Sequence, residues 1–271
     1  MLEVVNENFF GCMAAGLGIF SVPTLVRKTT SQAELDAILA DLNDWHNGPT
    51  FYCSTNDPAQ FFNRAVMWQG HTWASHNGLF VPAEWGKEIR HKHPELLTTR
   101  RLVGTTTEAG ILHAVPKDVF EEGEVLDSQV RFAIQDVRDV TKPGEFVVFF
   151  KRQWTDVQAE AIIFSAYWYY GAPYDVFEIG SYVSGLIPNL SQIRVCSTMV
   201  EWISEGRDPR LEDNDPKNFP RGDIEIRPWM KQHGIDPDKC APGHNGTYWF
   251  TSPKFTPVAI HCDVADARQK I

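Results

Sequence analysis

Apolar residues recur along the chain at two spacings, one typical of helices and one typical of strands. The segment that starts at Ser31 carries a capping box, with Glu34 three residues after Ser31. Apolar residues at helical spacing follow it, namely Leu35, Ile38, Leu39, Leu42 and Trp45. Asn47, Gly48 and Pro49 are typical of a helix end. The pattern predicts an amphipathic helix packed on the main body.

From about residue 50 the pattern changes to short apolar runs separated by turn residues. Residues 79–81, 111–115 and 146–150 are the clearest strand candidates. Because helical segments precede and follow these runs, the sequence predicts an α+β fold, with a small, mainly antiparallel sheet and helices packed against it.

Two further helices are predicted in the second half of the chain. Thr155 can cap the first of them, with Gln158 at the third position, and Gly171 ends it. The second is predicted over about residues 197–204. The polar, acidic and proline-bearing stretch 208–220 is typical of a long loop or linker, and the remaining tail has little periodicity.

Composition narrows the class of protein. Hydrophobic residues make up 43% of 271 residues, which is enough for a full buried core. The net charge is −10, with 35 acidic against 25 basic residues. Such a surface repels phosphate backbones, so nucleic acid is not an expected partner.

The cysteines indicate a reducing compartment and no disulfide framework. Their number is odd and no C-x-x-C pair occurs. Cys240, His244, His261 and Cys262 suggest a zinc site, but His261 and Cys262 are adjacent and would face opposite sides of a strand. No nucleotide-binding fingerprint appears, so we expect neither a metal nor an organic cofactor.

An apolar run begins at Phe9 and ends at Val26. The acidic Glu3 and Glu7 precede it, whereas a secretory signal begins with basic residues. The run is interrupted by Gly and Pro and is at the short limit for crossing a bilayer. We interpret it as a buried or partner-covered arm with no signal peptide, and membrane contact through it stays a second interpretation.

Cys196 is the first candidate for chemistry. Val195, Met199 and Val200 fit a helix that starts around the cysteine with one face buried. A thiol at a helix N-terminus meets unpaired N–H groups and the positive end of the dipole, which lower its pKa. The alternative is a small buried apolar side chain.

Three other residues fit supporting roles. His76 precedes an apolar strand, where an imidazole can face a helix N-terminus as a general base. Glu108 precedes the next strand and can orient that imidazole. Tyr174, on a Gly-Pro turn, can point its hydroxyl into a cleft. Each residue taken singly also fits an ordinary surface or core position.

The order of four short segments resembles a known enzyme family. They are Ser-His-Asn-Gly-Leu at 75–79, Thr-Glu-Ala-Gly at 107–110, Gly-Ala-Pro-Tyr-Asp at 171–175 and Cys-Ser-Thr-Met-Val at 196–200. The series is similar to the circularly permuted papain-like enzymes of the NlpC superfamily, in the branch of the YiiX-like hydrolases and the lecithin:retinol acyltransferase relatives. Asn77 stands where that branch usually has a hydrophobic residue.

The resemblance implies a thiol peptidase or amidase that works by acyl transfer. Cys196 would be the nucleophile, His76 the base and Glu108 the orienting acid, and Tyr174 and Ser197 would line the substrate and oxyanion side. The backbone N–H groups of the cysteine helix would stabilise the oxyanion.

The resemblance also implies a division of the chain. Residues 1–50 would be an apolar arm and amphipathic helix, residues 51–205 the catalytic domain, and residues 206–271 a C-terminal extension.

Three functions remain open on sequence alone. The first is cleavage of an amide bond in a cell-wall (peptidoglycan) peptide by a cytoplasmic or phage-carried enzyme. The second is a lipid acyltransferase or thioesterase on the same fold. The third is a structural or assembly protein with an inactive core, in which the extensions make oligomer or virion contacts.

Overall fold

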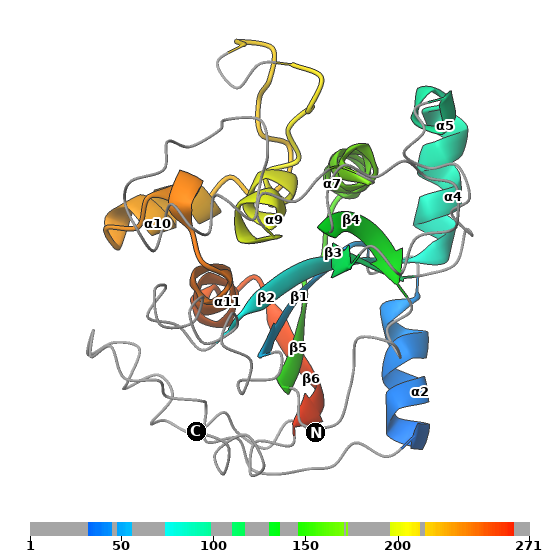
Figure 1. Cartoon of the computed structure of the whole chain (residues 1–271), viewed down its shortest axis with the longest axis vertical. Helices are drawn as coiled ribbons and strands as arrows, with labels where there is room; N and C mark the ends of the chain where they lie inside the picture. Colours follow the sequence, from blue (N-terminus) through cyan, green and yellow to red (C-terminus); the bar gives the residue numbers. More distant parts are fainter. Residues whose placement is uncertain are drawn as a thin grey trace.

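The structure is a computed structural model. It describes residues 32–44, 48–55, 74–98, 110–116, 130–135, 146–170, 172, 196–211 and 215–262. These residues form helices packed on both faces of one antiparallel sheet (Figure 1). The predicted α+β class is therefore confirmed.

The sheet has six strands in the order β4-β3-β2-β1-β5-β6, and every neighbouring pair is antiparallel. The strands are β1 (Thr50–Thr55), β2 (His76–Val81), β3 (Gly110–Pro116), β4 (Val130–Gln135), β5 (Phe146–Lys151) and β6 (Thr256–Cys262). The three predicted strands are confirmed as parts of β2, β3 and β5. Strands β1, β2 and β5 are paired along both edges, and successive side chains along them are buried, so both of their faces are covered.

The described helices are α2 (Gln32–Leu42), α4 (Ala83–Lys92), α5 (Glu95–Thr98), α7 (Asp156–Tyr169), α9 (Cys196–Ser204), α10 (Ile226–Gln232) and α11 (Pro242–Thr251), with a 3₁₀ turn η3 (Pro237–Lys239). Helices α2, α7 and α9 confirm the three predicted helices. The capping box of α7 is present: Thr155 Oγ1 accepts from the Gln158 N–H, and the Gln158 side chain accepts from the Thr155 N–H. No helix in the described ranges is long and apolar enough to cross a bilayer.

Side chains alternate between two cores along the central strands. Phe51 and Cys53 of β1 face the larger core, to which α7, α9 and α11 contribute. Tyr52 faces the smaller core with Phe80 and Phe149, and α2 packs against it. Because successive residues of a strand point to opposite faces, each core receives every second residue of β1, β2 and β5.

The sheet and the larger core continue beyond residue 205, into the stretch that the sequence predicted as a C-terminal extension. Strand β6 pairs with β5 along its length. Trp249 of α11 is fully buried and stacks on Phe51, with ring centroids 4.8 Å apart. Residues 215–262 are therefore part of the same folded body as the cysteine helix.

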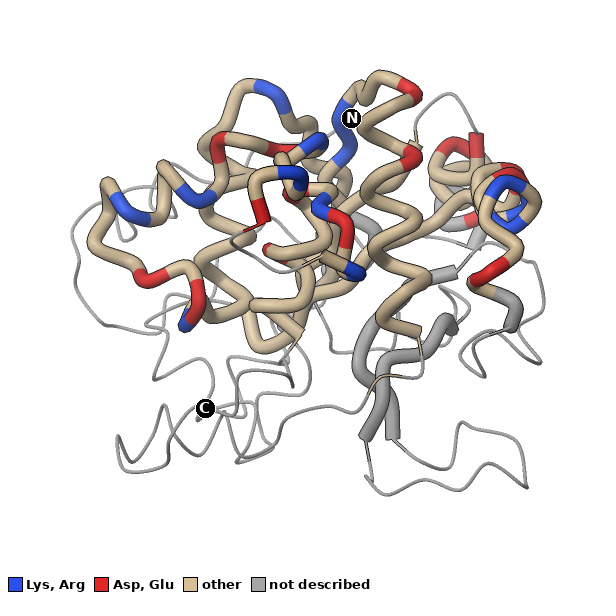
Figure 2. Tube along the Cα trace, turned by 90° about the horizontal axis from the view of Figure 1, so that it is seen from above, with Lys and Arg blue, Asp and Glu red and all other residues tan. Residues whose placement is uncertain are grey.

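Lys and Arg residues are interspersed with Asp and Glu over the described surface (Figure 2). Many of them are paired, as the charge chain described below illustrates.

Candidate functional site

Cys196 is the first residue of α9, as the sequence predicted. The helix packs on β2, and its cysteine side chain lies in the larger core with 3% of the residue exposed. A sulfur at this position meets the unpaired N–H groups of the first helical turn, and the helix dipole favours its ionised form. The placement suits a nucleophilic thiol.

The first turn of α9 is held by the segment that leads into α11. Ser197 Oγ donates to the Cys240 carbonyl at 2.5 Å, and Asn245 Nδ2 donates to the Ser197 carbonyl at 3.0 Å. Ser197 is 1% exposed. Its hydroxyl is therefore used inside the protein, which leaves only its backbone N–H for the oxyanion role that the resemblance implies.

A pair of buried amides connects this turn to the sheet. Asn245 Nδ2 also donates to Asn77 Oδ1 at 3.0 Å. Asn77 Nδ2 lies 2.6 Å from Cys53 Sγ and 3.4 Å from the Tyr52 carbonyl. Asn77 is the second residue of β2, so the start of α9 lies over the start of β2.

Cys53 is a second thiol on this face. Burial raises the pKa of the Cys53 thiol well above its usual value; the Asn77 side chain lowers it, and Cys196 raises it further. Cys53 Sγ also lies 3.6 Å from the Pro242 carbonyl. Cys53 is therefore expected to stay protonated, whereas the helix dipole acts on Cys196. Among the described residues, Cys53, Cys196 and Cys240 form no disulfide.

His76 lies on the other face of the sheet. It is directly opposite Ser54 in the register with β1, and its ring meets the Tyr52 ring edge-on, with centroids 6.0 Å apart. Tyr52 belongs to the core covered by α2, whereas Cys196 belongs to the core covered by α9. The structure brings the start of β2 under the start of α9 but does not bring the His76 ring to the Cys196 thiol.

The remaining predicted site residues, Glu108 and Tyr174, lie outside the described residues, as does the run from Phe9 to Val26. No cluster of three metal-ligating side chains occurs in the part of the chain that is described. The sequence interpretation missed Asn245 as a site residue. Its partner Asn77 carried one signal, because it is polar where the resembling enzymes have an apolar residue.

Comparisons with known proteins name no relative. No family model matches the sequence, and neither a curated protein nor a solved structure matches it. The function is therefore inferred from the residues themselves and from their positions in the fold.

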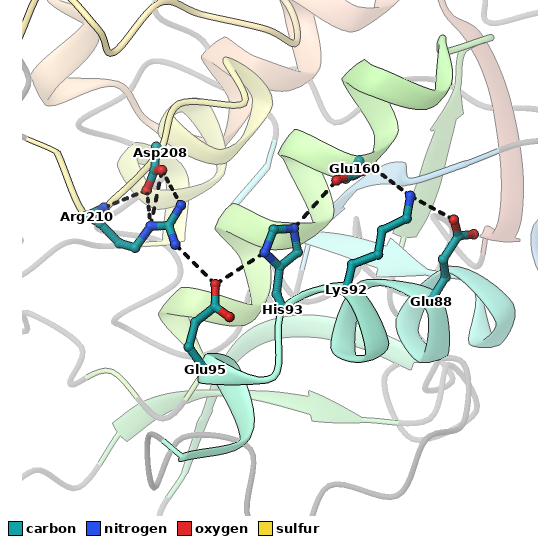
Figure 3. Close-up of polar contacts among 7 residues, drawn as sticks. All are labelled: Glu88, Lys92, His93, Glu95, Glu160, Asp208 and Arg210. Carbon is teal, nitrogen blue, oxygen red and sulfur yellow. Dashed lines mark hydrogen bonds and ion pairs between the residues drawn. The ribbon is translucent and has the colours of Figure 1, made fainter.

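A chain of charges lies along α4, α5 and α7 (Figure 3). The ring of His93 contacts Glu95 through Nδ1 at 3.2 Å and Glu160 through Nε2 at 3.5 Å. Lys92 extends the chain from Glu160 to Glu88, and Arg210 extends it from Glu95 to Asp208. These contacts tie three helices and the segment after α9 together. Each charged side chain in them has a partner within the protein, so the charge chain is best explained as structural.

This charge chain is expected to weaken in acid. The hydrogen bond from Lys92 holds the pKa of Glu160 below its ordinary value of 4.5, against the effect of burial. A lowered pKa stabilises the folded state fully above the unfolded value of about 4.3, and the contribution is lost as pH falls through the folded value. Glu160→Gln should reduce the unfolding free energy by about 0.5–1 kcal/mol at pH 7, because the pair is partly exposed.

Urea unfolding at pH 7 and pH 3 checks this expectation. The difference between wild type and Glu160→Gln should shrink at pH 3. Glu84→Gln is the matched control, because Glu84 pairs only with Lys87 on the exposed side of α4, among the contacts described. An equal difference at both pH values would contradict the assigned role of Glu160.

Proposed function

We propose that the protein is a papain-like cysteine hydrolase of the permuted NlpC type that cleaves an amide bond. One observation carries the proposal: Cys196 begins a buried helix packed on the strand that begins at His76. These are the two segments that the resemblance assigns to the nucleophile and to the base. The described strands under this helix form one antiparallel sheet. A papain-like fold of this type has such a sheet under its cysteine helix.

The proposed reaction is acyl transfer through a thioester. The Cys196 thiolate attacks the carbonyl carbon, and the C–N bond breaks as the amine leaves with a proton from the His76 imidazolium. Water then attacks the thioester and gives its proton to His76, which releases the acid and restores the thiolate. Backbone N–H groups at the start of α9 stabilise the oxyanion of each tetrahedral intermediate. Glu108 would orient the imidazole, and Tyr174 would line the cleft.

For the His76 imidazole to reach the Cys196 thiol, its ring has to move from the Tyr52 face of the sheet around the beginning of β2. His76 is the first residue of its strand, and the backbone bends at Ser75 just before it. The Asn245–Asn77 link keeps the first turn of α9 next to this strand end. This movement gives up the contact of the His76 ring with Tyr52 and the pairing of His76 with Ser54.

A cell-wall peptide is the proposed substrate, reached by release from a phage particle or after lysis. Lipid acyl esters and thioesters are the alternative substrates, because the same acyl-transfer reaction would cleave them. Incubation of the protein with purified peptidoglycan and with short acyl esters separates the two. New amino termini in the peptidoglycan support the amidase, and ester cleavage alone supports the lipid enzyme.

An inactive assembly protein is the second candidate, and a specific observation favours it. His76 and Cys196 lie on opposite faces of the sheet, and the thiol-bearing residue is almost fully buried. A core fixed in this state would have no base for its thiol. Neither substrate would then be cleaved, and no residue change would alter the result.

Replacement of His76 decides between these candidates. His76→Ala should lower kcat/KM by about 10³-fold if the ring transfers the proton to the leaving amine, and it should remove the basic limb of the pH profile, which reports loss of the imidazolium proton. His93→Ala is the control, because it removes a partly buried imidazole that belongs to the charge chain. Full activity in His76→Ala would mean that another group accepts the proton.

A further inference from the structure

We propose that Asn245 is a positioning residue for Cys196, so that the region predicted as an extension sets the reactivity of the nucleophile. The inference rests on the proposed function. Asn245 is fully buried in α11, at a distance of 48 residues from Ser197 along the chain. It joins the helix that carries the thiol to the strand on which that helix lies.

The hydrogen-bond network fixes the orientation of the Asn245 amide. Both groups that it meets, the Ser197 carbonyl and Asn77 Oδ1, are acceptors, so Nδ2 must face them. The Asn77 amide is fixed in turn, because its own Nδ2 lies toward the Tyr52 carbonyl and Cys53 Sγ. Each amide is therefore held in one orientation.

Asn245 combines two buried donor bonds with one buried acceptor that is not used. Its Oδ1 is buried and has no hydrogen-bond partner in the described part of the chain. A buried polar atom without a partner costs about 1–3 kcal/mol, whereas an apolar side chain would avoid that cost but leave Asn77 Oδ1 and the Ser197 carbonyl without their donor. The two donor bonds to the first turn of α9 and to β2 are what Asn245 provides in return.

These bonds act on the part of α9 that determines the thiol pKa. The Ser197 carbonyl and hydroxyl are held by Asn245 and by the Cys240 carbonyl, both from the segment around the start of α11. The first turn therefore keeps its N–H groups in a fixed place beside the Cys196 sulfur. If that turn frays, the dipole and the N–H groups stabilise the thiolate less, and the thiol pKa rises.

Site-resolved alkylation tests the inference without any substrate. The full-length protein is treated with iodoacetamide between pH 5 and pH 10, and the rate at Cys196 is measured by peptide mass spectrometry. In Asn245→Ala the pH midpoint should rise by about one unit, which is about tenfold slower labelling at pH values well below both midpoints. Asn245→Asp keeps the shape but replaces the donor by an acceptor, and it should raise the midpoint at least as far.

Asn218→Ala is the matched control. Asn218 is also buried in the C-terminal region, and its Oδ1 accepts from the Asp208 N–H at 2.9 Å, away from the Asn245–Asn77 pair. It should lower the melting temperature but leave the Cys196 midpoint unchanged. Equal midpoints in wild type and in both folded Asn245 variants would overturn the inference. A wild-type midpoint at or above about 8.5 would instead count against the proposed function, and the comparison between variants would still decide the role of Asn245.

Discussion

Replacement of Cys196 by alanine is expected to lower kcat/KM on the cleaved substrate by a factor of about 10⁴–10⁶. The sulfur is the atom that bonds to the acyl group, so its removal leaves only water as a nucleophile. Cys196→Ser should be nearly as inactive, because an alcohol at this position lacks the thiolate that the helix dipole stabilises. The measurement is steady-state hydrolysis of whichever substrate the wild-type protein cleaves.

Cys53→Ala is the matched control for this result. Cys53 is buried on the same face, but burial holds the pKa of its thiol well above its usual value. The variant should retain activity within a few-fold, after correction for the fraction folded. Activity that survives in Cys196→Ala, or that disappears equally in Cys53→Ala, would show that Cys196 is not the nucleophile.

The largest expected loss of stability follows from Arg227→Met. Glu201 of α9 is fully buried, and Arg227 Nε lies 2.8 Å from its Oε1. The same guanidinium contacts Glu205 and Asp238. Burial acts to lower the pKa of Arg227, but these three carboxylates raise it further than burial lowers it, so the arginine is charged in the folded protein. Methionine keeps the apolar stem but removes the guanidinium that contacts the Glu201 carboxylate.

We expect Arg227→Met to reduce the unfolding free energy by about 3–5 kcal/mol, as measured by urea unfolding. The double variant Glu201→Gln, Arg227→Met should recover part of this loss, because the amide removes the buried charge. Arg221→Met, at an exposed position, should change the value by less than about 0.5 kcal/mol. A loss below about 1 kcal/mol in Arg227→Met would mean that the carboxylate is stabilised by other groups.

The elements that the sequence predicted are those with strong local signals. Helix α7 has a complete capping box, and β5 is a continuous apolar run. Helix α4 was not predicted because charged residues dominate its sequence, although Trp85 and Ile89 give it a buried side. Helix α11 was missed because its two glycines give it low helix propensity, so its stability comes from packing.

The site was predictable in position but not in orientation. The sequence placed Cys196 at a helix start and His76 at a strand start, and both placements are confirmed. The face on which His76 lies depends on the pairing of β2 with β1, where His76 is opposite Ser54. Strand β1 was not predicted, and because side chains alternate with a period of two, a shift of one residue exchanges the faces.

The role of Asn245 could not be predicted from local sequence patterns, for a different reason. Its role depends on two hydrogen bonds to residues that are distant along the chain. Helix spacing gives no sign of them, since Asn is an unremarkable residue within a helix that carries glycines. Contacts of this kind become visible only when the chain is folded.

The central claim is that Cys196 is an activated thiolate, and its alkylation in the native wild-type protein tests this most directly. At pH 6, iodoacetamide should modify Cys196 at least about tenfold faster than Cys53 or Cys240, because only Cys196 begins a helix among these three. If Cys196 reacts no faster than the two other buried cysteines, or only after unfolding, the nucleophile assigned here is contradicted.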